Sequence, residues 1–405
     1  MASSIFSAIP EAPADPILGL NVAFQADPSP DKINLGVGAY RTEEGKPLVL
    51  NSVKKAEQLI LENPKYNKEY LPIDGLQDFI SAAQRLMFGK DIVASHGKQI
   101  VSVQSLSGTG SLRVGAEFIH RFMPNATVYI SEPTWPNHKN ICNVAGVPFK
   151  TYRYYSREQN GLDFQAMCED LKAAPPGSVI LLHACAHNPT GMDPTPEQWD
   201  ILENIIKEGK LFPFFDCAYQ GFASGDLDKD VAPVRTFLLR GHEMLVGQSF
   251  AKNLGLYAER IGALHVVAAN EPVTKPIRSQ LKQIIRPNYS NPPVHGALIA
   301  SIVLNTPELY EEWKAELKMM AGRIHNMRQL LFDALNQKGV SWPHVMKQIG
   351  MFSYTGLNAK QCETLINKHH IYLTLDGRIS LAGLSTKTVP IVANAIIDVL
   401  KESKL

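Results

Sequence analysis

The stretch MLVGQSFAKNLGLYAER, from Met244 to Arg260, runs from an apolar segment through a lysine to a glycine. Its first part, Met244 to Phe250, predicts a short buried strand, so Lys252 lies just past the carboxyl end of that strand. Open α/β sheets bind ligands at this end of their strands. A lysine there can lose its proton and attack a carbonyl group, whereas an ordinary loop lysine points to solvent. This stretch alone leaves both interpretations open.

Five more apolar runs accompany this strand, and helical patterns separate them. The runs lie at residues 99–104, 127–131, 178–185, 211–216 and 262–268. Between the third and the fourth run, apolar residues from Trp199 to Ile206 recur at helical spacing behind Pro196. Continuous apolar strands that alternate with helices are typical of a mostly parallel sheet covered on both faces. We therefore expect an α/β fold whose large domain has a mostly parallel central sheet flanked by helices.

The two ends of the chain have different patterns. Residues 1–30 are rich in proline and lack a clear period, which is typical of an extended arm. A long helical pattern at 308–335 leads into two strand-like runs and a final helix, which predicts a smaller α+β domain. We therefore divide the chain into an N-terminal arm, a small domain built from both ends and a large domain, with bounds 1–14, 15–45 plus 306–405, and 46–305.

The composition is that of an ordinary globular protein. Of the 405 residues, 45% are hydrophobic and 20% are charged. The net charge is +1, so no overall field favours nucleic acid or a membrane as a partner. No apolar run reaches the ~18 residues that a membrane span requires. Five cysteines without a CxxC pair indicate reduced thiols in an intracellular compartment.

Both termini bear on location. The first basic residue is Lys32, so we expect neither a secretory signal nor a mitochondrial transit peptide. The chain ends in Ser403, Lys404 and Leu405, and a receptor reads a terminal SKL as a peroxisomal address. A frayed helix end is the alternative, but this tripeptide is rare by chance. We expect a location in the peroxisome, in the cytoplasm, or in both.

If Lys252 forms a Schiff base with an aldehyde cofactor, pyridoxal phosphate is the obvious candidate. This cofactor needs a cup for its phosphate, a partner for its ring nitrogen and a surface for its ring. The motif SLSGTG follows an apolar run and opens a helical pattern, so its N–H groups and hydroxyls suit a phosphate, although such a turn is weak evidence alone. The predicted cup comprises Ser107, Gly108, Thr109, Ser249 and Arg260.

Three residues near predicted strand ends suit the cofactor ring. Asp216 ends an apolar run, where its carboxylate can pair with a protonated ring nitrogen or, alternatively, cap a turn. Tyr219 can hydrogen-bond the ring oxygen, and Trp135 in PTWPNH can stack on the ring face. Either aromatic side chain would otherwise be core packing. Their value as evidence depends on the whole set.

The motif HACAHNPTG admits two interpretations. His183, Cys185 and His187 alternate along a predicted strand and suggest a zinc site. Three ligands strung along one strand cannot close a tetrahedral site, so we expect no metal. We favour a rigid turn in which the Asn188 amide faces the site, with a cis bond to Pro189 as an option.

Two arginines lie in apolar or proline-rich surroundings, where an unpaired guanidinium is costly. These are Arg286 in IIRPNYSNPP and Arg378 in DGRISLAGL. The fork geometry of arginine matches a carboxylate, so two such residues predict a dicarboxylate substrate. An internal salt bridge is the alternative for either one.

Together these motifs resemble the aspartate aminotransferases, which are pyridoxal-phosphate enzymes of fold type I. The resemblance covers almost the whole chain. Its motifs occur in the same order as in the family, and they are NLGVGAYR, SLSGTG, PTWPNH, HACAHNPTG, FFDCAYQGF, SFAKNLGLYAER, RPNYSNPP and QIGMFSYTGL. The resemblance implies a ping-pong reaction that reversibly transfers the amino group of L-aspartate to 2-oxoglutarate, giving oxaloacetate and L-glutamate. An aromatic-amino-acid aminotransferase on the same scaffold is the alternative. A lyase with the same cofactor and a binding protein without catalysis are more distant ones.

The resemblance implies roles for the cofactor residues. Lys252 would be the Schiff-base lysine and proton shuttle. Asp216 would pair with the ring nitrogen, with His138 and His183 behind it. The ring would also be held by Asn188, Tyr219 and Trp135.

The resemblance further implies an obligate homodimer with shared active sites. Arg378 would bind the α-carboxylate of the substrate, and Arg286 of the neighbouring subunit would bind the distal carboxylate. Tyr70 would reach the neighbour's phosphate. The implied partners are thus dicarboxylic amino acids, 2-oxo acids and a second copy of the chain, and the entrance would be lined by Val37, Gly38 and Phe352.

Overall fold

The structure is a computed structural model that describes residues 4–402 except for residues 14 and 16. The predicted peroxisomal signal at 403–405 lies outside the described residues. Within the described part of the chain, no helix has the length and apolar character needed to cross a membrane.

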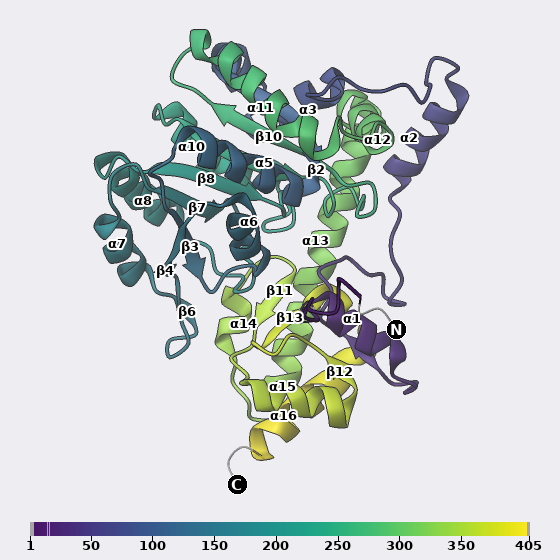
Figure 1. The fold of residues 1–405 in the computed structure, drawn as a ribbon. Helices are drawn as coiled ribbons and strands as arrows, with labels where there is room; N and C mark the ends of the chain where they lie inside the picture. The colour runs from purple at the N-terminus through teal and green to yellow at the C-terminus, as the bar shows by residue number, and fades with distance from the viewer. Residues whose placement is uncertain (1–3, 14, 16, 403–405) are drawn as a thin grey trace.

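A seven-stranded sheet forms the upper part of the molecule (Figure 1). Strand β10 alone runs antiparallel to its neighbours, so the sheet is mostly parallel, as predicted. All six predicted strands are present, and a seventh, β4, was not predicted. In spatial order the strands are β2 (Ile100–Leu106), β10 (Ile261–Val267), β9 (Met244–Ser249), β8 (Phe212–Cys217), β7 (Val179–His183), β3 (Val128–Glu132) and β4 (Phe149–Arg153).

Helices cover both faces of this sheet, which explains why its strands are apolar without interruption. In β7, Val179 and Leu181 pack into one hydrophobic cluster, and Ile180 and Leu182 pack into another. This alternation follows from the two-residue period of a strand. The first cluster is closed by α5 (Ser107–Phe122), α6 (Asn137–Ala145) and α11 (Thr274–Tyr289). The second is closed by α3 (Gln77–Phe88), α7 (Phe164–Ala173), α8 (Pro196–Glu208) and α10 (Ala232–Leu239).

Helix α8 shows how the sequence fixes a helix start. The Thr195 side chain accepts from the backbone N–H of Gln198, and the Gln198 side chain accepts from the N–H of Thr195. Pro196 occupies the first helical position, where no N–H is needed. The predicted helix behind Pro196 is therefore confirmed.

The long helix α13 (Pro307–Asn336) runs from beside α12 (His295–Asn305) down to the lower part of the molecule (Figure 1). There β1 (Ile33–Asn34) pairs in parallel with β12 (Ile371–Tyr372), and β11 (Phe352–Tyr354) pairs with β13 (Arg378–Ser380). The two ends of the chain therefore meet, as the predicted small domain requires. The domain bounds themselves stay a prediction. The helices of this part are α14 (Pro343–Lys347), α15 (Ala359–His369) and α16 (Thr388–Glu402).

One expectation for the N-terminus was wrong. Helix α1 (Leu18–Ala26) occupies part of the stretch 1–30 that was expected to be extended. Before it, Ile5, Phe6 and Ile9 are exposed. The remaining elements are α2 (Asn51–Glu62), α4 (Lys90–His96), α9 (Leu227–Asp230), β5 (Tyr155–Ser156), β6 (Gly161–Leu162) and three short 3-10 helices, η1 (Gly97–Gln99), η2 (Glu271–Val273) and η3 (Leu381–Gly383).

Candidate active site

A cavity of about 230 Å³ lies where β7, β8 and β9 end. Parallel strands whose carboxyl ends meet at one edge give a common ligand site there. Most of the predicted site residues line this cavity. These lining residues are Gly38, Ser107, Gly108, Thr109, Trp135, His183, Asn188, Asp216, Tyr219, Ser249, Lys252, Arg260, Phe352 and Arg378.

Lys252 lies in the turn that follows β9, and its side chain is half-buried. Its Nζ lies 4.9 Å from the centroid of the Tyr219 ring. Among the described residues, Nζ has no hydrogen-bond or ion-pair partner. Burial lowers the pKa of Lys252 to about 8, although the charge of Asp216 opposes this shift. The neutral, nucleophilic amine is therefore accessible near neutral pH.

Asp216 lies near the end of β8 with one carboxylate oxygen engaged. Its Oδ2 accepts from Nε2 of His138 at 2.9 Å, and Nδ1 of His138 lies 2.8 Å from Oγ1 of Thr134. Burial raises the pKa of Asp216, but the hydrogen bond from His138 and the charge interactions with His138, His183 and Lys252 together outweigh burial and hold the pKa below its ordinary value. The carboxylate is thus ionised, and it faces a cavity where a cation can bind.

His183 lies behind this pair. Its Nε2 lies 3.4 Å from Oγ1 of Thr134, and burial lowers its pKa to about 3, so the ring is neutral. The zinc interpretation assumed that His183, Cys185 and His187 lie on one strand. Strand β7 ends at His183, so Cys185 and His187 are not part of it. The ring of His187 instead folds back and stacks on His183 with centroids 4.1 Å apart. The described residues contain no group of three or more side chains placed to hold a metal ion.

Arg378 begins β13 and is 3% exposed. Its guanidinium donates to the carbonyl oxygen of Gly36 at 2.6 Å and to Oδ1 of Asn188 at 3.2 Å. Its Nε has no partner, and no carboxylate pairs with Arg378 in the described part of the chain. Burial lowers its pKa. A buried cation with only neutral partners at a cavity wall is suited to bind an anion.

Two tight features shape the rest of this wall. The Asn188–Pro189 bond is cis, as the sequence allowed. At Gly38 a Cβ atom would lie 2.8 Å from Cζ of Phe352, so glycine lets the backbone approach the cavity. Trp135 is half-buried and meets the ring of His138 edge-on at 5.3 Å.

The predicted phosphate cup is assembled at the start of α5. The helix begins at Ser107, so its first N–H groups have no partners within the helix. Oγ of Ser107 lies 3.0 Å from Oγ of Ser249. At Gly108 a Cβ atom would lie 3.2 Å from Cβ of Ser249, which leaves little room for any side chain. Arg260 adds a cation to the same wall.

Tyr70 and Arg286 lie apart from this cavity. Tyr70 is 83% exposed, and the exposed Arg286 contacts Oγ of Ser290, which directly follows its helix α11. Neither residue lines the cavity of its own chain. Val37 also lies elsewhere, on a separate hollow near α1.

Several lining residues were not predicted. Tyr257 follows Lys252 by five positions, so its place in the quoted stretch was a usable signal. Ile17 comes from the far N-terminus, and nothing local in the sequence points to it. The full set of unpredicted lining residues is Ile17, Leu112, Cys185, Ala218, Ala251 and Tyr257.

Comparisons with known proteins place the chain in a family. The model of the family described as aminotransferase class I and II matches residues 30–396. Aspartate aminotransferase 1 of Medicago sativa is 56% identical over 98% of this chain and 95% of its own length.

Solved structures agree in fold. The aspartate aminotransferase from Saccharomyces cerevisiae cytoplasm has a TM-score of 0.96 and 43% identity, covering 98% of this chain and 99% of the other. An aromatic-amino-acid aminotransferase from Burkholderia pseudomallei, covalently bound to pyridoxal phosphate, has a TM-score of 0.94 and 42% identity, covering 98% and 100%. The chain therefore belongs to the class I and II aminotransferase family.

Proposed function

We propose that the protein is a pyridoxal-phosphate-dependent aspartate transaminase. It reversibly transfers the amino group of L-aspartate to 2-oxoglutarate, which gives oxaloacetate and L-glutamate in a ping-pong reaction. The observation that carries this proposal is one cavity that contains both an unpartnered amine, Lys252, and a buried guanidinium without an acidic partner, Arg378. The 56% identity to aspartate aminotransferase 1 of Medicago sativa supports aspartate as the substrate.

The cavity fits pyridoxal phosphate on three counts. The start of α5 offers free N–H groups beside two hydroxyls and Arg260, which suits a phosphate. The ionised Asp216 can keep a ring nitrogen protonated. Lys252 can present a neutral amine to an aldehyde. Asn188, Tyr219 and Trp135 would hold the ring.

The bound cofactor supplies an aldehyde and a ring that accepts the electron pair released at the substrate Cα. The chain supplies the rest. Arg378 binds the α-carboxylate with its forked N–H groups and so orients the Cα–H bond toward Lys252. The Nζ of Lys252 takes that proton as a general base and later returns it. Asp216 stays ionised because His138 donates to it throughout.

The active assembly in this proposal is a homodimer. A dicarboxylate needs a second cationic receptor, and the described part of one chain offers the cavity none beyond Lys252, Arg260 and Arg378. Arg286 is exposed and free of carboxylate partners there, so a neighbouring subunit can use it. The exposed Tyr70 would serve the neighbour's phosphate in the same way.

The proposal for location has two parts. The similar yeast enzyme comes from cytoplasm, which supports the cytoplasm for this protein. The terminal SKL supports import into peroxisomes. A fluorescent protein fused to the N-terminus should collect in peroxisomes and should stay diffuse when residues 403–405 are deleted.

An absorption titration tests the activity. Aspartate alone should convert the aldehyde form of the bound cofactor to its amine form, and 2-oxoglutarate should reverse the change. If aspartate leaves the spectrum unchanged, the proposal is wrong. Comparing kcat/KM for aspartate and phenylalanine separates the aromatic-amino-acid alternative, which the Burkholderia structure supports, because that alternative requires the larger value for phenylalanine.

A further inference from the structure

The segment from Gly36 to Glu43 contributes one wall of the cavity through Gly38. Its start is fixed to the strands of the lower part of the molecule. The N–H of Leu35 donates to the carbonyl oxygen of Tyr372 at 2.8 Å. The N–H of Ser380 donates to the carbonyl oxygen of Leu35 at 2.6 Å. Arg378 then binds the carbonyl oxygen of Gly36. A shift of this segment would therefore displace a partner of Arg378.

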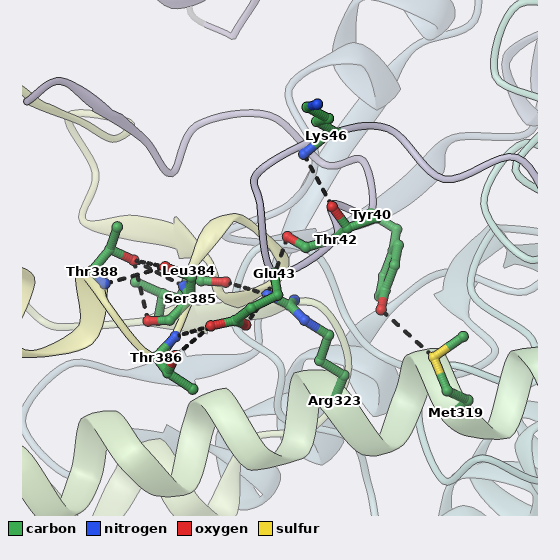
Figure 2. A network of polar contacts seen from close by, with 10 residues as sticks. All are labelled: Tyr40, Thr42, Glu43, Lys46, Met319, Arg323, Leu384, Ser385, Thr386 and Thr388. Atoms are coloured by element: carbon green, nitrogen blue, oxygen red, sulfur yellow. Dashed lines mark hydrogen bonds and ion pairs between the residues drawn. The ribbon is translucent and has the colours of Figure 1, made fainter. Parts of the chain in front are cut away.

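The end of the segment is fixed to helix α13 and to the loop between η3 and α16 (Figure 2). Arg323 of α13 donates to the carbonyl oxygens of Thr42 at 3.3 Å and Leu384 at 2.7 Å, and to Oε2 of Glu43 at 3.1 Å. The other carboxylate oxygen of Glu43 accepts from the N–H of Thr386 at 2.7 Å. Both ends of the segment are thus tied to residues beyond 305.

A single hydrogen bond ties the segment to the part of the cavity that residues 47–305 form. The backbone N–H of Tyr40 donates to the hydroxyl oxygen of Tyr257 at 2.9 Å. It is the one hydrogen bond between residues 36–43 and residues 47–305, two ranges that the structure describes in full. Tyr257 lies five residues after Lys252 and lines the cavity itself.

The loop that carries Tyr257 is held by its own contacts. Arg260 donates to the carbonyl oxygen of Tyr257 at 3.0 Å. The N–H of Gly255 donates to the carbonyl oxygen of Lys252 at 3.0 Å. Burial raises the pKa of Tyr257, so its hydroxyl stays neutral over the physiological range. The bond to Tyr40 therefore joins the loop that carries Lys252 to the segment 36–43.

We propose that Tyr257 is a positioning residue whose hydroxyl fixes the gap between Lys252 and Arg378 in which a dicarboxylate substrate binds. The inference rests on the proposed function. Without the hydroxyl, residues 36–40 lose their hydrogen bond to the lysine loop, so that bond no longer fixes Gly36 and its partner Arg378 relative to Lys252. Lys252 and the phosphate cup keep their contacts, so cofactor binding should not change.

The test compares Tyr257→Phe with Tyr40→Phe, each as the cofactor-loaded protein. Both changes remove one hydroxyl and keep the ring. The hydroxyl of Tyr40 contacts Sδ of Met319 on α13 at 3.9 Å, and the backbone N–H of Tyr40 survives the change (Figure 2). Succinate, a dicarboxylate that cannot react, serves as the probe, and calorimetry measures its Kd. Cofactor content and Tm are measured in parallel.

We expect Tyr257→Phe to raise the Kd of succinate and the KM of aspartate about tenfold, with cofactor content and Tm close to wild type. Tyr40→Phe should stay within about twofold of wild type. An unchanged Kd in Tyr257→Phe overturns the inference, and so does a fall in Tm and cofactor content that accounts for the change. A wild-type protein that neither binds succinate nor converts aspartate would overturn the proposed function instead.

Discussion

The inner and outer parts of the candidate site differ in how complete one chain makes them. In the inner part, Lys252, Asp216 and Arg378 come from three separate elements and line one cavity. In the outer part, Tyr70 and Arg286 are exposed and line no part of that cavity. In the proposed function, the groups for the chemistry are therefore assembled within a single chain, whereas the second carboxylate receptor would come from a neighbouring subunit. The proposed function therefore predicts that discrimination between substrates with one and with two carboxylates depends on a second subunit.

The strongest test of the inner part is Lys252→Ala. Without the amine, no neutral base faces the substrate, and we expect kcat to fall by about 10⁴-fold or more. Steady-state assays with aspartate measure the loss. Lys275→Ala, on an exposed face of α11, is the matched control and should keep full activity. Substantial turnover of aspartate by Lys252→Ala would show that Lys252 is not the catalytic base.

Arg378→Met should have the next largest effect. The change removes a buried cation that has only neutral partners within the described chain, so the substrate carboxylate would lose its charged receptor. We expect kcat/KM for aspartate to fall about 10² to 10³-fold, with cofactor content retained. Stopped-flow or steady-state kinetics measure the first quantity, and absorbance measures the second. Retained kcat/KM would show that another group binds the α-carboxylate.

Arg286→Met tests the outer part. We expect kcat/KM for aspartate to fall about 10 to 100-fold, because one of two carboxylates would lose its cation. Substrates with a single carboxylate should be less affected than aspartate. An equal loss for both kinds of substrate would contradict the proposed role of Arg286.

Mixing two chains with different defects tests whether the outer part belongs to a neighbour. Lys252→Ala and Arg286→Met chains, unfolded together and refolded as a mixture, form hybrids with one intact site if Arg286 acts across subunits. The mixture should recover about a quarter of wild-type activity, since half of random dimers are hybrids with one such site. Activity no higher than that of Arg286→Met alone would place Arg286 in its own chain's site.

The smallest predicted effect concerns pH. Burial disfavours the ammonium form of Lys252 and lowers its pKa to about 8, so the neutral amine increases as pH rises through that value. The rate at which the cofactor-free protein takes up pyridoxal phosphate should rise about tenfold from pH 7 to pH 9 and then level off. An ordinary lysine would give a rate that still rises above pH 10.

Sequence patterns predicted the sheet well where strands are buried on both faces. The six long apolar runs were all strands. Strand β4 was not predicted because it lies at the edge of the sheet. Tyr152 is its only buried residue, so its sequence lacks a continuous apolar run. Strands β1 and β13 have two and three residues, too few for any period to be visible.

Site residues that are close together in the sequence were easier to predict than contacts between residues far apart in the sequence. Ser249, Lys252 and Arg260 lie in one stretch, so a strand end was enough to bring them together. Arg378 was predicted as a carboxylate receptor, but its bond to Gly36 depends on how β13 packs against the N-terminal segment. The contact of Tyr257 with the Tyr40 backbone joins positions 217 residues apart and leaves no local pattern.

The late position of Arg378 bears on how the protein is made. All seven strands of the large sheet precede residue 268, so the ribosome has delivered the sheet, the predicted phosphate cup and Lys252 well before Arg378. At typical elongation rates, translation from Val267 to Arg378 takes on the order of 10 s. During that interval a nascent chain can display a reactive amine in a half-built pocket.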